Sequence, residues 1–285
     1  MNTGNYDHGG FMGAGGGRNE AQQAVRRARH AASQARIAAA TRAYRETLVR
    51  EIFALPVRDC AYRCVGRPVS VLRAGCLTPL DELGLSQLRD SGFEISVVTV
   101  DQAGPPFTPP PGAIGAGDVR LGDLRTVPMP PRSFDVVHCA LLLDRISHVE
   151  LVLDRFTAAL RPGGLLLLRI RDRDCAAGLL DRLLPQWARR LLWARLAPGR
   201  PGPFPAVYEQ AASDRGVQAY MRMRGLVITQ RETGRTVPDG PDRVSRAVSA
   251  ACGLISWLTR GRLTDAYDEV LYVIRKPEDR FARVV

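Results

Sequence analysis

The chain has 285 residues, which is long enough to bury one sizeable hydrophobic core with an appendage. Hydrophobic residues make up 45% of it, as in a globular protein, and no run approaches the ~20 apolar residues that a transmembrane helix needs. The formal net charge is +11, and nearly all the basic residues are arginine because Lys276 is the only lysine. We interpret the arginine richness as a compositional bias of the sequence rather than as a sign of specific nucleic-acid binding, because no nucleic-acid recognition motif accompanies it.

The amino-terminal part divides into two segments. Residues 1–18 are a low-complexity, Gly-rich tail that we predict to be disordered, and they lack the apolar core of a signal peptide. We therefore expect a cytoplasmic protein. Residues 19–56 form a predicted basic helical extension, whose second half should pack on the domain because large apolar residues begin only at Tyr44. The helix is interpreted as a solvated charged helix, with a lid, a dimer contact or an anionic membrane-surface contact as alternatives.

Residues 57–285 alternate between strand-like and helix-like patterns, which predicts an α/β domain. Strands are expected at 69–72, 95–100, 119–121, 134–139, 165–170, 226–229 and 269–274, and helices at 83–88, 149–160, 216–224 and 244–259. A helical insertion at about 172–215 interrupts this order. Its Leu/Trp stripe from Leu179 to Leu196 predicts one amphipathic helix that forms part of a substrate pocket, packs as an ordinary surface helix, or contacts a membrane.

The segment from Gly122 to Ile170 carries the strongest signals. Phe134–Cys139 and Leu165–Ile170 are short apolar runs, as in parallel strands buried on both faces. Pro162, Gly163 and Gly164 should end the helix between them. Ligands of parallel sheets bind beyond the carboxyl ends of the strands, so Asp123 and Cys139–Leu141 are expected to face one crevice.

These motifs resemble the middle of class I S-adenosylmethionine-dependent methyltransferases. In that family an acid follows the third strand, an F-D-x-V strand comes next, and L-R-P-G-G leads into the fifth strand; Asp123, Phe134–Val137 and Leu160–Gly164 stand in those places. The resemblance extends from about Pro68 to Pro277. It implies a three-layer, Rossmann-like α/β fold, with a mostly parallel sheet and an antiparallel last strand, and it implies S-adenosylmethionine as cofactor.

The resemblance also implies which residues bind the cofactor. Asp123 and Leu124 match the adenine side, and Asp101 matches the acid that holds the ribose hydroxyls. The remaining matched positions lie in the loop after the first strand and at the end of the fourth, namely Gly75, Cys76, Thr78, Cys139 and Ala140.

The loop after the first strand departs from the family pattern. Leu77 and Pro79 replace two glycines that normally let the backbone approach the cofactor, and Arg73 replaces an acid that accepts a hydrogen bond from its ammonium group. Asp81 or Glu82 could substitute for this acid. These departures favour a second hypothesis, that the protein is a non-catalytic, degenerate methyltransferase-fold binding or interaction module.

Few residues qualify for acid–base chemistry. His138 and His148 lie nearest the expected crevice, and a structural role is the alternative for both; the pairs Asp144-Arg145 and Tyr208-Glu209 are further candidates. No Ser–His–acid triad or metal site emerges, and the six cysteines read as small buried thiols in a reducing compartment. The favoured function is S-adenosylmethionine-dependent methylation of a small molecule, such as a specialised metabolite.

Overall fold

One mixed sheet of seven strands forms the centre of the molecule, in the order β3-β2-β1-β4-β5-β7-β6. The five strands from β3 to β5 are parallel, and β7 runs antiparallel to both β5 and β6. This is the predicted architecture, including the antiparallel last strand. The strands are β1 (Val69–Ala74), β2 (Ile95–Gln102), β3 (Asp118–Gly122), β4 (Phe134–Ala140), β5 (Leu160–Arg171), β6 (Val227–Gly234) and β7 (Glu269–Arg275).

The computed structural model describes residues 16–64, 66–75, 80–102, 118–196, 206–235 and 243–278. The predicted tail up to residue 15, the loop 104–117, and the site positions Cys76 and Thr78 lie outside these ranges. The helices are α1 (Gly16–Arg63), the 3₁₀ helix η1 (Leu80–Leu83), α2 (Leu85–Asp90), α3 (Val149–Ala159), α4 (Ala176–Leu183), α5 (Gln186–Leu196), η2 (Gln210–Ala212), α6 (Asp214–Met223) and α7 (Arg243–Leu258).

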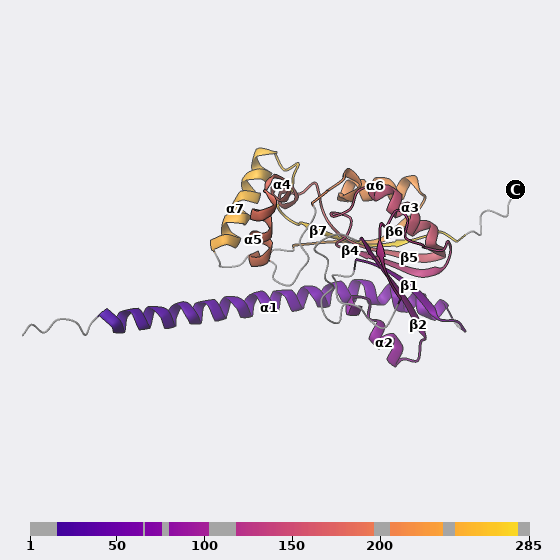
Figure 1. Ribbon diagram of the computed structural model, residues 1–285, viewed down its shortest axis with the longest axis horizontal. Helices are drawn as coiled ribbons and strands as arrows, with labels where there is room; N and C mark the ends of the chain where they lie inside the picture. The colour runs from indigo at the N-terminus through magenta and orange to yellow at the C-terminus, as the bar shows by residue number, and fades with distance from the viewer. Residues whose placement is uncertain are drawn as a thin grey trace, which may run out of the picture.

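Helices cover both faces of the sheet, which makes three layers (Figure 1). The second half of α1 and the short α2 pack on one face, while α3 and α6 pack on the other. Every residue of β4 is buried, as expected for a central parallel strand covered on both sides. Helices α4, α5 and α7 gather beyond the sheet in Figure 1, and α4 begins five residues after β5 ends.

The predicted amino-terminal helix is confirmed, but it is longer than expected. It begins at Gly16 and continues through Pro56 to Arg63. Its second half supplies Val49, Phe53 and Val57 to the core cluster on the α1 face of the sheet. Burial of these side chains opposes the loss of a backbone hydrogen bond at Pro56, so the helix does not end where its sequence pattern suggests.

Two further boundaries differ from the sequence prediction. The insertion contains two helices rather than one, because Pro185 separates α4 from α5. Strand β5 begins at Leu160 rather than Leu165, so the Pro-Gly-Gly motif follows the end of α3 directly and lies inside the strand. A Cβ on Gly164 would lie 3.0 Å from the carbonyl oxygen of Asp135, which explains the glycine at this close approach of β4 and β5.

Candidate functional site

The carboxyl ends of β1, β2, β3 and β4 meet at one edge of the sheet. Ala74 pairs with Val100 on one side and with Cys139 on the other. This register brings the predicted positions Gly75, Asp101 and Cys139 to one edge, and Asp123 follows β3 at the same edge. The residues predicted for the adenosine side therefore lie together at this edge of the sheet.

Gly75 is required by the packing of the strands. Its backbone has φ of +93°, and a Cβ added there would lie 2.5 Å from the carbonyl oxygen of Ala140. Its N–H donates to the carbonyl of Val100 at 3.0 Å. Glycine is therefore needed to let β1 leave the sheet beside β4, whether or not a ligand is bound. Cys76 and Thr78, the other predicted residues of this loop, lie outside the described residues.

Asp101 lies at the end of β2 and is completely buried. Its Oδ1 accepts a hydrogen bond from the N–H of Gln102 at 2.7 Å and lies 3.4 Å from Nη2 of Arg145. Arg145 is in turn anchored by donation from Nε to the carbonyl of Leu141 at 3.0 Å. A buried carboxylate needs such a partner, because desolvation disfavours an isolated charge. Arg145 is thus the charged partner of Asp101, the residue predicted to hold the ribose.

Asp123 is accessible and follows β3 directly. Arg125 donates to it from Nη2 at 2.6 Å, from Nε at 2.9 Å and from its backbone N–H at 2.9 Å. These hydrogen bonds from the Arg125 side chain and backbone, with a smaller contribution from the charge of His148, lower the pKa of Asp123 to about 2. Its carboxylate therefore remains an acceptor at any physiological pH, which suits an exocyclic amino group.

The backbone around Asp123 is held in place from both sides. The N–H of Leu124 donates to the side-chain oxygen of Gln102 at 3.2 Å, and its carbonyl accepts from Arg155 at 2.9 Å. Leu124 itself is fully buried in the core cluster shared with α3. The start of the loop that follows β3 is therefore held in place by hydrogen bonds at this edge of the sheet.

Cys139 and Ala140 end β4 in the interior. Both are fully buried, and burial raises the pKa of the Cys139 thiol, which stays protonated. Ala140 contributes its carbonyl to the close contact with Gly75. Both residues belong to the buried end of β4, and the protonated Cys139 thiol is unsuited to nucleophilic chemistry.

The two histidines occupy different environments. His138 is completely buried, and burial together with Arg73 and Arg169 lowers its pKa to about 3, so the ring is neutral. His148 is exposed, with φ of +59° directly before α3. Glu209 accepts from the N–H groups of His148 and Val149 at 2.7 and 2.9 Å, so the Glu209 side chain caps the start of α3 and His148 contributes only its backbone N–H.

A buried charge layer lies under the second half of α1. Its members project from neighbouring elements on one face of the sheet, namely Arg73 of β1, Glu82 of η1, His138 of β4, Arg169 of β5 and Glu269 of β7. Arg169 contacts both Glu82 and Glu269, and Nε2 of His138 lies 3.5 Å from Glu82. The sequence signal for this layer is an arginine inside an apolar strand, seen at Arg73 and again at Arg169.

Arg73, which replaces the family's acid at the end of the first strand, is part of this buried charge layer. Arg73 is only 1% exposed, next to His138 in the register of β1 and β4. Glu82, one of the two predicted substitutes for that acid, is bound to Arg169 inside the layer, while the Asp81 side chain lies outside the described part of the chain. The glutamate therefore pairs with Arg169 of β5.

A second buried cluster fastens the insertion to the end of β5. Asp181 of α4 accepts from Trp193 Nε1 at 2.8 Å and from the Tyr208 hydroxyl at 2.9 Å. The guanidinium of Arg171 lies 4.4 Å from the centre of the Trp193 ring and donates to Asp144 at 2.8 Å. Burial raises the pKa of Asp181, and the cluster links α4, α5 and the segment before α6.

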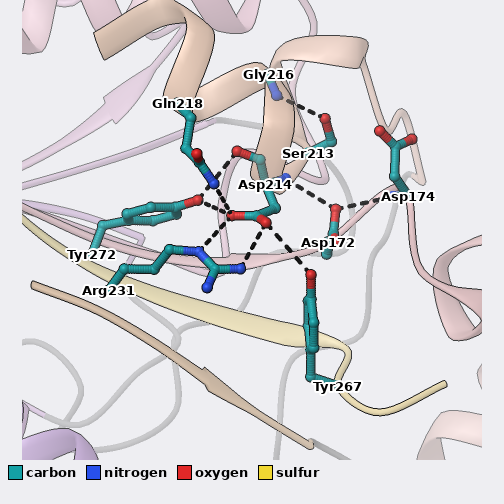
Figure 2. A network of polar contacts seen from close by, with 9 residues as sticks. All are labelled: Asp172, Asp174, Ser213, Asp214, Gly216, Gln218, Arg231, Tyr267 and Tyr272. Atoms are coloured by element: carbon teal, nitrogen blue, oxygen red, sulfur yellow. Dashed lines mark hydrogen bonds and ion pairs between the residues drawn. The ribbon is translucent and has the colours of Figure 1, made fainter. Parts of the chain in front are cut away.

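The polar network around Asp214 is structural (Figure 2). Its carboxylate accepts from Arg231 at 2.7 and 2.9 Å, from Gln218 at 2.9 Å and from the hydroxyl of Tyr272. Burial opposes ionisation of Asp214, but these hydrogen bonds outweigh it and lower its pKa. Its own N–H donates to Asp172 at 3.0 Å. The network joins the start of α6 to β5, β6 and β7 and leaves this carboxylate well satisfied.

Solved structures with a similar chain path have low sequence identity. A loganic acid methyltransferase with SAH is 13% identical, with a TM-score of 0.47, and the alignment covers 88% of this chain and 96% of that one. A SAM-dependent methyltransferase from Archaeoglobus fulgidus is 14% identical, with a TM-score of 0.44 and coverage of 80% and 94%. One from Mesorhizobium loti is 16% identical, with a TM-score of 0.43 and coverage of 73% and 91%. No curated protein sequence matches this chain.

The family assignment comes from the sequence itself. A family model described as a methyltransferase domain matches residues 48–206. This match runs from the buried half of α1, through β1 to β5 with the predicted site residues, and ends inside the predicted insertion, after α5. Because it spans more than half of the chain, the protein belongs to this methyltransferase domain family, whose cofactor is S-adenosylmethionine.

Proposed function

We propose that this protein transfers the methyl group of S-adenosylmethionine to a small-molecule acceptor. The observation that carries the proposal is the family match over residues 48–206, which contains the crevice with Asp101 and Asp123 at one edge of the sheet. The bound cofactor supplies an electrophilic methyl group on a sulfonium. The contribution of the chain is then mainly to hold donor and acceptor in line.

The described residues fit the adenosine half of the cofactor. Adenine presents an amino donor, for which the ionised Asp123 is an acceptor, and the fixed loop at Leu124 lies beside it. Ribose presents hydroxyl donors, for which Asp101 is the acid at the end of β2. Asp101 is buried and lies 3.4 Å from Arg145, and its carboxylate oxygens are the kind of acceptor that ribose hydroxyls need.

The insertion supports a small acceptor. The cluster around Asp181 fixes α4 and α5 beyond the carboxyl end of β5, where they would close the acceptor side of the crevice. The histidines give little support to a side-chain base, because His138 is enclosed beside Glu82 and His148 lies near Asp123, on the adenine side. Transfer therefore depends on positioning and on an acceptor that is itself nucleophilic.

Titration calorimetry with S-adenosylmethionine and with S-adenosylhomocysteine tests the cofactor site. Asp123→Ala should weaken binding of either ligand by about ten- to a hundredfold, as expected for loss of a hydrogen bond to a charged group. Asp154→Ala is the control, because Asp154 is an accessible acid on α3 that pairs with Arg224. Unchanged affinity in Asp123→Ala would show that the adenine side is elsewhere.

A second candidate function rests on the altered loop and the sheet arginines. Arg73 stands where the family has an acid, and Asp101 already has Arg145 as its partner. Both features suit a methyltransferase fold that works as a binding or interaction module. The same titrations decide between the two, because absence of binding up to millimolar ligand would contradict the enzyme and support the module.

A further inference from the structure

The three helices beyond the sheet carry large apolar side chains that face solvent. Helices α4, α5 and α7 lie together beyond the sheet in Figure 1, on the side toward which the first part of α1 extends. Six of their side chains are between 55% and 75% exposed, which is unusual for leucine and tryptophan. We call this set the tryptophan face: Leu183, Trp187, Leu191, Leu254, Trp257 and Leu258.

The exposed positions follow the spacing of single helix faces. Trp187 and Leu191 are four residues apart on α5, and Leu254, Trp257 and Leu258 have spacings of three and four on α7. The opposite side of α5 packs against the interior of the protein, because buried Trp193 donates a hydrogen bond to Asp181 there. The exposed stripe therefore is not required for packing within the described part of the chain.

The charge around the tryptophan face is mostly positive. Residues 176–193 and 244–263 contain a single acid, Asp181, and it is buried. The exposed charged residues in these two stretches are all arginine, namely Arg190, Arg246, Arg260 and Arg262. One exposed acid, Asp265, lies beside Gly253 of α7, so the arginines outnumber the acids but do not stand alone. A surface that combines tryptophan, leucine and an excess of arginine matches an anionic, partly apolar partner.

We propose that the tryptophan face docks on the surface of an anionic lipid bilayer. Tryptophan and leucine would enter the boundary between headgroups and acyl chains, and the arginines would contact the anionic headgroups. Within the described ranges, no helix has the length and apolarity to cross a bilayer, so the helices lie along the surface. The proposal is independent of methyl transfer.

Charge also favours the bilayer over a second copy of the chain. In a twofold contact each copy presents the same surface to the other, so an arginine-rich surface would face the arginine-rich surface of its partner. Like charges brought together in this way disfavour association. An anionic bilayer meets the same arginines with opposite charge.

Co-sedimentation of the full chain with vesicles tests the proposal. We expect binding to vesicles that mix phosphatidylcholine and phosphatidylglycerol, and much weaker binding to phosphatidylcholine alone. The double variant Trp187→Ser/Trp257→Ser should lower the partition coefficient at least about tenfold, because it removes two of the largest apolar groups from the contact. Arg246→Gln/Arg260→Gln should remove most of the preference for the anionic lipid.

A matched control uses apolar residues that are equally exposed elsewhere. Met223 at the end of α6 and Val227 at the start of β6 are 71% and 54% exposed. Met223→Ser/Val227→Ser should bind vesicles like the unmodified chain. All variants change exposed side chains, and equal melting temperatures would show that each is folded.

Three results would overturn the proposal. The first is absence of binding to both kinds of vesicle, and the second is equal binding by the tryptophan variant. The third is a loss of self-association in the tryptophan variant, measured by light scattering without lipid, which would assign the face to a second copy. Removal of residues 1–42 is a further check, because a complete loss of vesicle binding there would place the contact on the arginine-rich part of α1.

Discussion

Arginine occupies buried sheet positions in this protein, and each arginine of the charge layer has to be compensated. Arg169 of β5 contacts Glu82 and Glu269, both almost completely buried. Such groups are expensive to desolvate, so removing one member of a buried pair costs about 3–5 kcal/mol, whereas an exposed pair contributes about 0–1 kcal/mol. A change in the charge of any one of the five side chains would therefore leave a buried charge without compensation. Arg73, which stands in the family's acid position, is one of these five structural residues.

His138 makes stability depend on pH. Its pKa falls from 6.5 to about 3, because burial and the neighbouring arginines Arg73 and Arg169 disfavour the charged ring. Between these two values the unfolded chain binds more protons than the folded one, so folding stability falls as pH falls through this window. At about pH 5 the loss from this residue is roughly 2 kcal/mol relative to about pH 7.5.

Urea unfolding at the two pH values measures this effect. His138→Gln removes the titrating group. Between the two pH values, the free energy of unfolding of this variant should therefore fall by roughly 2 kcal/mol less than that of the unmodified chain. Comparing the pH dependence within each variant cancels any pH-independent cost of the substitution. Parallel behaviour of the two proteins would mean that His138 is protonated in the folded state.

Several site residues could be predicted from their order along the chain, but their partners could not. Asp123 is predicted because it follows an apolar run and the carboxyl ends of parallel strands share an edge, whereas Asp101 is predicted from the family resemblance; both stay predictions as ligand contacts. The pairing of Asp101 with Arg145 joins positions 44 residues apart, and no spacing rule anticipates it. The role of His138 likewise depends on Glu82 and Arg169, which only the folded sheet brings beside it.

At the level of elements, the second half of α1 is part of the hydrophobic core. Phe53 is fully buried against the sheet, with its ring 5.5 Å from that of His138, whereas Leu55 on the same helix is 53% exposed. Phe53→Ala should therefore lower the free energy of unfolding by about 3–5 kcal/mol, through lost burial and a cavity. Leu55→Ala should change it by less than about 0.5 kcal/mol.

Chemical denaturation of the two alanine variants provides the comparison. Both substitutions introduce a good helix former at interior positions of one helix, so helix propensity does not separate them. Equal losses of stability would imply that this half of α1 is not packed on the sheet as described.

Element boundaries were harder to predict than elements. Periodicity located every strand, since apolar runs and helical spacing are local signals. It failed where tertiary packing competes with a breaker. Pro56 lies inside α1 because the surrounding turns are held by the core, whereas Pro185 separates α4 from α5. The exposed stripe of α7 was also missed, because a sequence does not show which of two apolar faces is buried.

At the scale of the whole molecule, α1 joins two regions with different roles. Its described side chains between Ala32 and Leu48 are exposed, and its contribution to the core begins at Val49. In Figure 1 the helix runs well past the sheet on the side of α5 and α7. The first part is therefore available for a role as a lid or a contact surface, while the second part holds the fold together.

Deletion of residues 1–42 separates these roles. We expect the melting temperature to change by less than about 2 °C, because the described core residues of α1 all remain and a stability change of less than about 0.5 kcal/mol moves a domain of this size only slightly. Deletion of residues 1–56 removes Val49, Ile52 and Phe53 and should abolish cooperative unfolding. A large drop in melting temperature in the shorter deletion would show that the first part of α1 supports the fold. If the melting temperature is unchanged but affinity for S-adenosylmethionine falls, the helix acts as a lid, because only a contact made with ligand bound would then be lost.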